Sequence, residues 1–188
     1  MFFIKHKSEA LQCFKEYKAR TETAHPGHPV QRLRCDGAGE NTSNAFRQFL
    51  TDNGIKYELT TASTPEQDGV SERLNRTLMD KARSMLAAAG LIDSDEGKRF
   101  WAYAVDTANV LRNVSPTTVS PDATITPYEA YTGRKPRAVN LRAFGADIYV
   151  HVQDRDRDKV DPRGVKMIFV GYADEYKAWP MLQRRRQQ

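Results

Sequence analysis

Apolar residues recur at helical spacing from Ser71 to Ala89, the most regular stretch of the chain. Steps of three and four residues put them on one face of an amphipathic helix, and the glycine at position 90 suits a helix end. The same spacing predicts a second helix over Lys98–Asn113. The first apolar face consists of Leu74, Leu78, Ala82, Met85, Leu86 and Ala89, and the second of Phe100, Trp101, Ala104, Val105, Ala108 and Leu111.

Shorter elements of both types precede these two helices. Alternation of apolar and polar residues marks the strand candidates, helical spacing marks the segments between them, and glycines or prolines separate them. Thr42 or Ser43 is suited to cap the second of the short helices. The pattern predicts strands at Met1–Lys5, Val30–Cys35 and Ile55–Thr61, helices at Glu9–Arg20 and Asn44–Asn53, and a loop at Ser63–Gly69.

The pattern changes after the second long helix. Four prolines between residues 115 and 137 predict a linker, with one helical turn near Thr126–Ala130. Two β-prone runs follow at Phe144–Val152 and Lys166–Tyr172, and the alternating charges of residues 154–159 predict an exposed hairpin loop between them. The arginine-rich end of the chain is predicted to be frayed.

Composition narrows the functional class. No apolar run reaches the roughly 18 residues that a membrane helix needs, so no membrane partner is expected. Cys13 and Cys35 are too few for a disulfide framework and are expected to be reduced thiols. The net charge is +5, yet residues 36–71 hold six acidic and two basic side chains. An acidic segment within a basic chain suits a cation site that meets a polyanion such as nucleic acid.

Asp36 and Glu72 are the candidate metal ligands, with thirty-five residues between them. Asp36 ends a predicted strand and Glu72 opens the first long helix, so the two carboxylates can converge on a divalent ion, as in two-metal phosphoryl-transfer sites. At about 100° per residue, Glu72 shares a helix stripe with Asn75, Arg76 and Arg83. Arginines beside a metal-binding carboxylate are well placed to hold phosphates.

Several segments, taken in order, resemble the integrase of copia-type (Pseudoviridae-like) retrotransposons. Leu33–Glu40 (LRCDGAGE) resembles the family's L-R-S-D-N-G-G-E, and Thr64–Thr77 (TPEQDGVSERLNRT) resembles T-P-Q-Q-N-G-V-A-E-R-x-N-R-T. Phe100–Val105, Thr126–Pro136 and Leu141–Val152 are similar to later family motifs. The resemblance runs from Met1 to about Tyr172, so it covers most of the chain.

The resemblance implies an α/β fold, with a ribonuclease-H-like catalytic core over residues 1–114, a linker over 115–140, an SH3-like β-barrel region over 141–175 and a frayed tail over 176–188. It implies Mg²⁺ or Mn²⁺ held by Asp36 and Glu72 and catalysis of DNA integration. It also implies DNA contact by Gln67 in the predicted loop and by Asn75, Arg76 and Arg83. Element ends and target DNA, with RNA as a further possibility, are the expected nucleic acids, bound by a nuclear homo-oligomer that passes through a cytoplasmic particle stage.

The sequence also departs from the family. The first catalytic aspartate belongs to a strand that would precede Met1, so the core is expected to lack its first two strands and the barrel to be partial. Glu9, Glu16 and Glu40 do not sit at a predicted strand centre and are not expected to replace that aspartate. Two acids in the predicted DNA loop, Glu66 and Asp68, should weaken phosphate binding. We therefore expect weak metal binding and no integration by this chain alone.

Other candidate signals favour ordinary structure. His25 and His28 flank prolines without a paired cysteine motif, so a solvated turn is preferred to zinc. Residues 37–39 form a Gly-Ala-Gly turn without the lysine of a phosphate loop. Trp101 lies on an apolar stripe and is expected in the core. The alternatives to an integrase segment are a non-catalytic or domesticated nucleic-acid-binding module and a fragment that does not fold stably.

Overall fold

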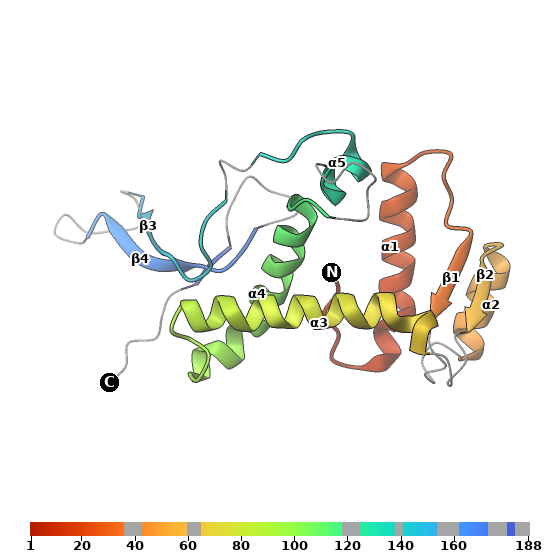
Figure 1. Cartoon of the computed structure of the whole chain (residues 1–188), viewed down its shortest axis with the longest axis horizontal. Helices are drawn as coiled ribbons and strands as arrows, with labels where there is room; N and C mark the ends of the chain where they lie inside the picture. Colours follow the sequence, from red (N-terminus) through yellow and green to blue (C-terminus); the bar gives the residue numbers. More distant parts are fainter. Residues whose placement is uncertain are drawn as a thin grey trace. The chain divides into compact units, whose positions relative to one another are not determined.

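The computed structural model describes residues 1–35, 43–59, 65–117, 125–137, 141–153, 162–172 and 180–182. The chain divides into two compact units, Met1–Asn75 and Arg76–Gln188, each with its own strands (Figure 1). The first unit contains a parallel strand pair and the second an antiparallel sheet. The predicted mixed α/β class is confirmed, whereas the ribonuclease-H-like arrangement and the predicted domain boundaries stay predictions.

The first unit is built around one strand–helix–strand segment. A short 3₁₀ helix, η1 (Lys7–Glu9), leads into α1 (Ala10–Ala24), and β1 (Arg32–Cys35), α2 (Asn44–Asp52) and β2 (Lys56–Leu59) follow. β1 and β2 pair in parallel, so their connection needs a crossover, which α2 provides. The core consists of Phe46, Leu50 and Ile55, with Leu11, Phe14, Val30, Leu33, Phe49 and Tyr57 packed against it.

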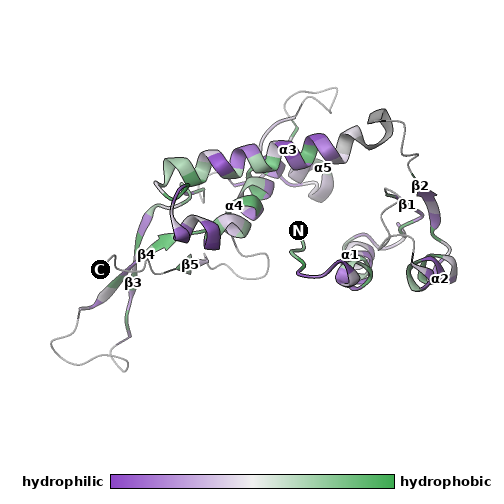
Figure 2. Cartoon of the chain, turned by 90° about the horizontal axis from the view of Figure 1, so that it is seen from below, coloured by the Kyte–Doolittle hydropathy of each residue, from purple (hydrophilic) through white to green (hydrophobic). Residues whose placement is uncertain are grey.

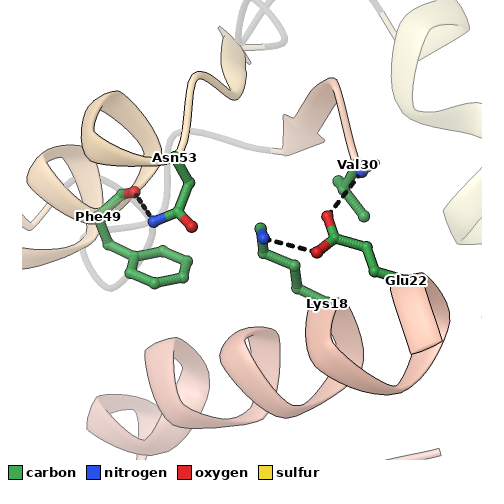
Figure 3. Close-up of polar contacts among 5 residues, drawn as sticks. All are labelled: Lys18, Glu22, Val30, Phe49 and Asn53. Atoms are coloured by element: carbon green, nitrogen blue, oxygen red, sulfur yellow. Dashed lines mark hydrogen bonds and ion pairs between the residues drawn. The ribbon is translucent and has the colours of Figure 1, made fainter. Parts of the chain in front are cut away.

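A carboxylate fixes the passage from α1 into β1. Glu22 accepts a hydrogen bond from the Lys18 ammonium at 2.8 Å and from the Val30 backbone N–H at 3.0 Å (Figure 3). The hydrogen bond from Lys18, followed by that from Val30, lowers the pKa of Glu22 from its ordinary value. In the same view the Asn53 amide donates to the Phe49 carbonyl at 2.8 Å and closes the end of α2. These local contacts lie shortly before β1 and β2, which begin at Arg32 and Lys56.

The second unit packs two long helices beside a small sheet. α3 (Pro65–Ala88) crosses from the first unit, and α4 (Asp95–Val114), α5 (Pro127–Thr132), β3 (Asp147–His151), β4 (Gly164–Phe169) and β5 (Met181–Leu182) follow. The strands are antiparallel in the order β3-β4-β5. Hydrophilic and hydrophobic residues alternate along α3 (Figure 2). The buried apolar side chains include Leu78, Ala82, Leu86, Leu91, Phe100, Ala104, Ala108, Phe144, Ile168, Phe169 and Val170.

Most predicted elements are confirmed, and so are the predicted cap at Ser43 and the predicted helix end at Gly90. Ser43 accepts a hydrogen bond from the Phe46 N–H at the start of α2, and Thr126 caps α5 in the same way. Gly90 has a φ of 67° directly after α3, a conformation that glycine adopts without a Cβ clash. The predicted hairpin loop at 154–159 lies outside the described residues. The chain end 184–188 also lies outside them.

Four expectations are wrong. Met1–Lys5 is not a strand: among the described strands β1 pairs only with β2, and Met1 to Ile4 are exposed. Pro65 to Gly69, expected as loop, open α3, since a proline fits the first helical turn. Trp101, expected in the core, is 49% exposed because it lies at the border of the apolar face of α4, whose centre, with Phe100 and Ala104, is buried. Residues 181–182, expected in a frayed tail, pair with β4 as β5.

Candidate nucleic-acid and metal site

β1 leads the chain to Asp36, the first candidate metal ligand. Leu33 packs on the core of the first unit, while Arg32 and Arg34 on the same strand are exposed, as the twofold period of a strand requires. Asp36 itself lies outside the described residues, one position after β1 ends at Cys35. Its predicted role therefore stays a prediction that rests on its position at the strand end.

Glu72 lies on α3 and is exposed to solvent. A carboxylate oxygen in that position is accessible to a hydrated divalent ion, and oxygen ligands are the ones that Mg²⁺ prefers. Among the described residues, no group of three or more His, Cys, Asp or Glu side chains is arranged to hold a metal. Carboxylate oxygens, which Asp36 and Glu72 both offer, are donors that Mg²⁺ or Mn²⁺ accepts, and the metal site that joins the two residues stays a prediction.

The predicted nucleic-acid contacts also lie on α3. Asn75, Arg76 and Arg83 are exposed, while Gln67 is in the first turns of the helix and its side chain lies outside the description. Arg83 donates to the Asp80 carboxylate at 3.1 Å, with both side chains more than half exposed. Exposed pairs of this kind contribute only about 0.2–1 kcal/mol, so Arg83 can exchange this partner for a phosphate.

Arg83 also borders a groove between α3 and α4 in the second unit. The groove has a volume of about 480 Å³ and an apolar floor, and Lys98 and Trp101 lie along it. Trp101 was assigned to the core from helical spacing, so this exposed surface was missed. The remaining residues of the groove are Met79, Ala82, Leu86, Ile92, Gly97 and Val105.

Four charged side chains, which we call the β1–β2 charge ladder, were also missed from the sequence. Glu58 forms ion pairs with Arg32 at 3.2 Å, with Arg34 at 3.2 Å and with Lys56 at 3.3 Å. Partial burial alone would raise the pKa of Glu58. Hydrogen bonds from Arg34 and Lys56 and the charges of Arg32 and Lys56 outweigh burial and lower that pKa. The ladder is a signal that only the strand register reveals.

Known proteins match this chain over nearly its whole length. It is 36% identical over 188 residues to the retrovirus-related Pol polyprotein from transposon TNT 1-94 of Nicotiana tabacum, covering 98% of this chain. It is 26% identical over 173 residues, 92% of this chain, to the corresponding polyprotein from transposon RE2 of Arabidopsis thaliana. This chain is homologous to part of the Pol polyprotein of copia-type retrotransposons. It spans 14% and 11% of the lengths of these two relatives.

The Pol homology confirms the family resemblance drawn from the sequence motifs. Residues 146–187 match the retroviral polymerase SH3-like domain, which takes in β3, β4 and β5. The match thus places the unpredicted strand β5 within the SH3-like region.

One solved structure shows a weaker likeness. It is a chain from the cryo-EM structure of the simian T-cell lymphotropic virus intasome in complex with PP2A regulatory subunit B56 gamma. The identity is 14%, the TM-score 0.47, and the match covers 96% of this chain and 63% of that chain. That TM-score is too low to establish a shared fold. In the described part of this chain, no helix has the length and apolarity to cross a membrane.

Proposed function

We propose that this chain is a segment of a retrotransposon integrase and that its family activity is divalent-metal-dependent DNA integration. The observation that carries the proposal is the Pol homology across 98% of the chain, which includes the motifs around Asp36 and Glu72. On this proposal the chain meets element ends and target DNA, with RNA as a further nucleic acid. It acts as a nuclear homo-oligomer after a cytoplasmic particle stage.

Asp36 and Glu72 would hold Mg²⁺ or Mn²⁺, together with a third carboxylate supplied from outside these 188 residues. Held by these carboxylates, such an ion would supply activation of the attacking oxygen and stabilisation of the leaving oxygen of a phosphodiester. The residues of this chain bind and orient the substrate. Exposed cations on α3, Arg76 and Arg83, hold the phosphates, and Asn75 contacts the DNA end.

Because two carboxylates are an incomplete set, the 188 residues alone are expected to bind DNA without joining it. This behaviour coincides with the second candidate function, a non-catalytic nucleic-acid-binding module, which the net charge of +5 favours. The two candidates differ in their use of Glu72. An integrase segment needs the Glu72 carboxylate for the metal, whereas a simple binding module does not.

A strand-transfer assay with Mn²⁺ and a labelled DNA end tests the proposal in two forms of the protein. In the 188-residue chain we expect salt-dependent DNA binding and no joined product. In a longer form, extended at its amino terminus with the preceding segment of a related polyprotein, we expect joining that Glu72→Gln abolishes. Joining by the short chain, abolished by Glu72→Gln, would contradict the requirement for a third carboxylate.

The neighbouring substitution Ser71→Ala is the matched control, because Ser71 is an exposed α3 residue without a carboxylate. It should leave joining by the longer form intact. If Glu72→Gln and Ser71→Ala had the same effect in the longer form, the integrase assignment of Glu72 would be wrong and the binding-module function would be favoured.

A further inference from the structure

The register of the β1–β2 pair places two cations directly opposite each other. Arg32 faces Lys56, and Arg34 faces Glu58 at the next position on the same side of the sheet. Like charges directly opposite across two strands destabilise the pair. An ion pair within the sheet requires only Arg34 and Glu58. The additional cations Arg32 and Lys56, which repel each other, therefore favour a negatively charged ligand outside the sheet.

One carboxylate cannot neutralise the three cations of the ladder. The Arg32, Arg34 and Lys56 side chains are 58%, 56% and 67% exposed, whereas Glu58 is 21% exposed. Among the described residues, the three cations of the ladder thus carry two positive charges more than Glu58 balances. Glu58 holds all three cationic groups within 3.3 Å of its oxygens, which keeps them gathered on one face of the strand pair.

We propose that the β1–β2 charge ladder binds the phosphodiester backbone of duplex DNA, with Glu58 as an internal counter-ion that gathers the three cations. The proposal rests on the proposed DNA-directed function and adds a contact surface to it. Arg32 and Arg34 are two residues apart on one strand, about 6.6 Å. Two arginines at that spacing can each donate to a phosphate of the same DNA backbone.

The position of the ladder along the chain connects it to the candidate metal site. β1 ends at Cys35, and Asp36 is the next residue. Arg34, which would hold a phosphate, precedes the candidate metal ligand Asp36 by two residues in the sequence. The other face of the strand pair packs against the core through Leu33 and Tyr57, so the ladder face is the one left for a ligand.

The test measures binding of the full chain to a fluorescent DNA duplex as a function of salt concentration. The ladder variant carries Arg32→Gln, Arg34→Gln and Lys56→Gln. If each cation contacts a phosphate, the slope of log affinity against log salt should fall in magnitude by about 2.7, which is three contacts at about 0.9 each. The single variant Glu58→Gln should tighten binding about 3–10-fold, because it removes the carboxylate that competes with phosphate.

The matched control removes the same charge from exposed cations in the second unit, through Arg134→Gln, Lys135→Gln and Arg137→Gln. Its salt slope should change by less than about one contact. Circular dichroism melts confirm that each variant is folded. A gain of affinity in Glu58→Gln cannot come from unfolding, so that variant keeps the test decisive even if the triple ladder variant is unstable.

Two results would overturn the proposal while leaving the proposed function in place. The first is an equal loss of slope in the ladder and control variants, and the second is weaker binding by Glu58→Gln. If the native chain shows no salt-dependent DNA binding, the proposed function fails and the ladder proposal fails with it.

Discussion

The hydroxyl of Thr107 joins α4 to the sheet of the second unit, and its removal gives a defined prediction. Thr107 is 1% exposed, and its Oγ1 donates to the Val170 carbonyl at 3.3 Å. The two residues are 63 positions apart, so this contact ties a helix to the chain just after β4. Thr107→Val keeps the branched shape of the side chain and deletes only the donor.

The expected loss of stability follows from two opposing contributions. Deleting the donor leaves the buried Val170 carbonyl without the Thr107 hydroxyl, which costs about 1–3 kcal/mol. The added methyl group returns up to about 0.8 kcal/mol through apolar burial. The net loss should be about 1–2 kcal/mol, which lowers Tm by about 2–8 °C in a chain of this size.

Thermal melting measures the loss, and hydrogen exchange locates it. Thr132→Val is the control, because Thr132 also donates its hydroxyl to a carbonyl, that of Tyr128, but is exposed. We expect Thr107→Val to lower protection in both α4 and the β3–β4 pair, because both belong to one compact unit. An equal Tm for the two variants, or lost protection in the strands alone, would refute this reasoning.

Three further predictions follow from burial and charge. Leu50→Ala should cost about 2–5 kcal/mol in urea unfolding, because Leu50 is 1% exposed in the core of the first unit. Phe100→Ala should cost about 3–5 kcal/mol, whereas Trp101→Ala, at an exposed position, should cost far less in the same assay. Glu22→Gln should lower the free energy of unfolding at neutral pH. The difference in this free energy between the variant and the native chain should shrink as the pH falls below 4.5, the ordinary carboxyl pKa. The reason is that the lowered pKa of Glu22 reflects contacts that stabilise only its ionised form.

Elements defined by local spacing were predictable from the sequence. The stripe that includes Leu78, Ala82 and Leu86 is buried, and the glycine after it ends α3. Ser43 caps α2 through its own hydroxyl. Each of these features depends on residues within one or two helical turns, so the local sequence is sufficient to predict it.

Elements that depend on distant partners were not predictable. A strand needs a hydrogen-bonded neighbouring strand. The residues of Met1–Lys5 and Met181–Leu182 alone do not indicate whether such a neighbour is present. The first is not a strand in the described chain, while the second pairs with β4 although it is two residues long. The exposure of Trp101 also depends on a distant segment. Helical spacing places Trp101 at the border of the apolar face of α4, and its solvent exposure depends on how α3 packs beside it.

In the candidate site, too, some features were predictable from local sequence and others depend on the pairing of distant segments. The motifs located Asp36 and Glu72 by position, but the ladder beside Asp36 exists only because Arg32 aligns with Lys56 and Arg34 with Glu58. A shift of one residue in β2 would turn Lys56 and Glu58 to the core side and place Tyr57 among the arginines, since side chains alternate between faces. Burial of Ile55 and Tyr57 against α2 prevents that shift. The apolar core on one face of the sheet therefore determines which charges meet on the other face, which is the surface that we propose binds DNA.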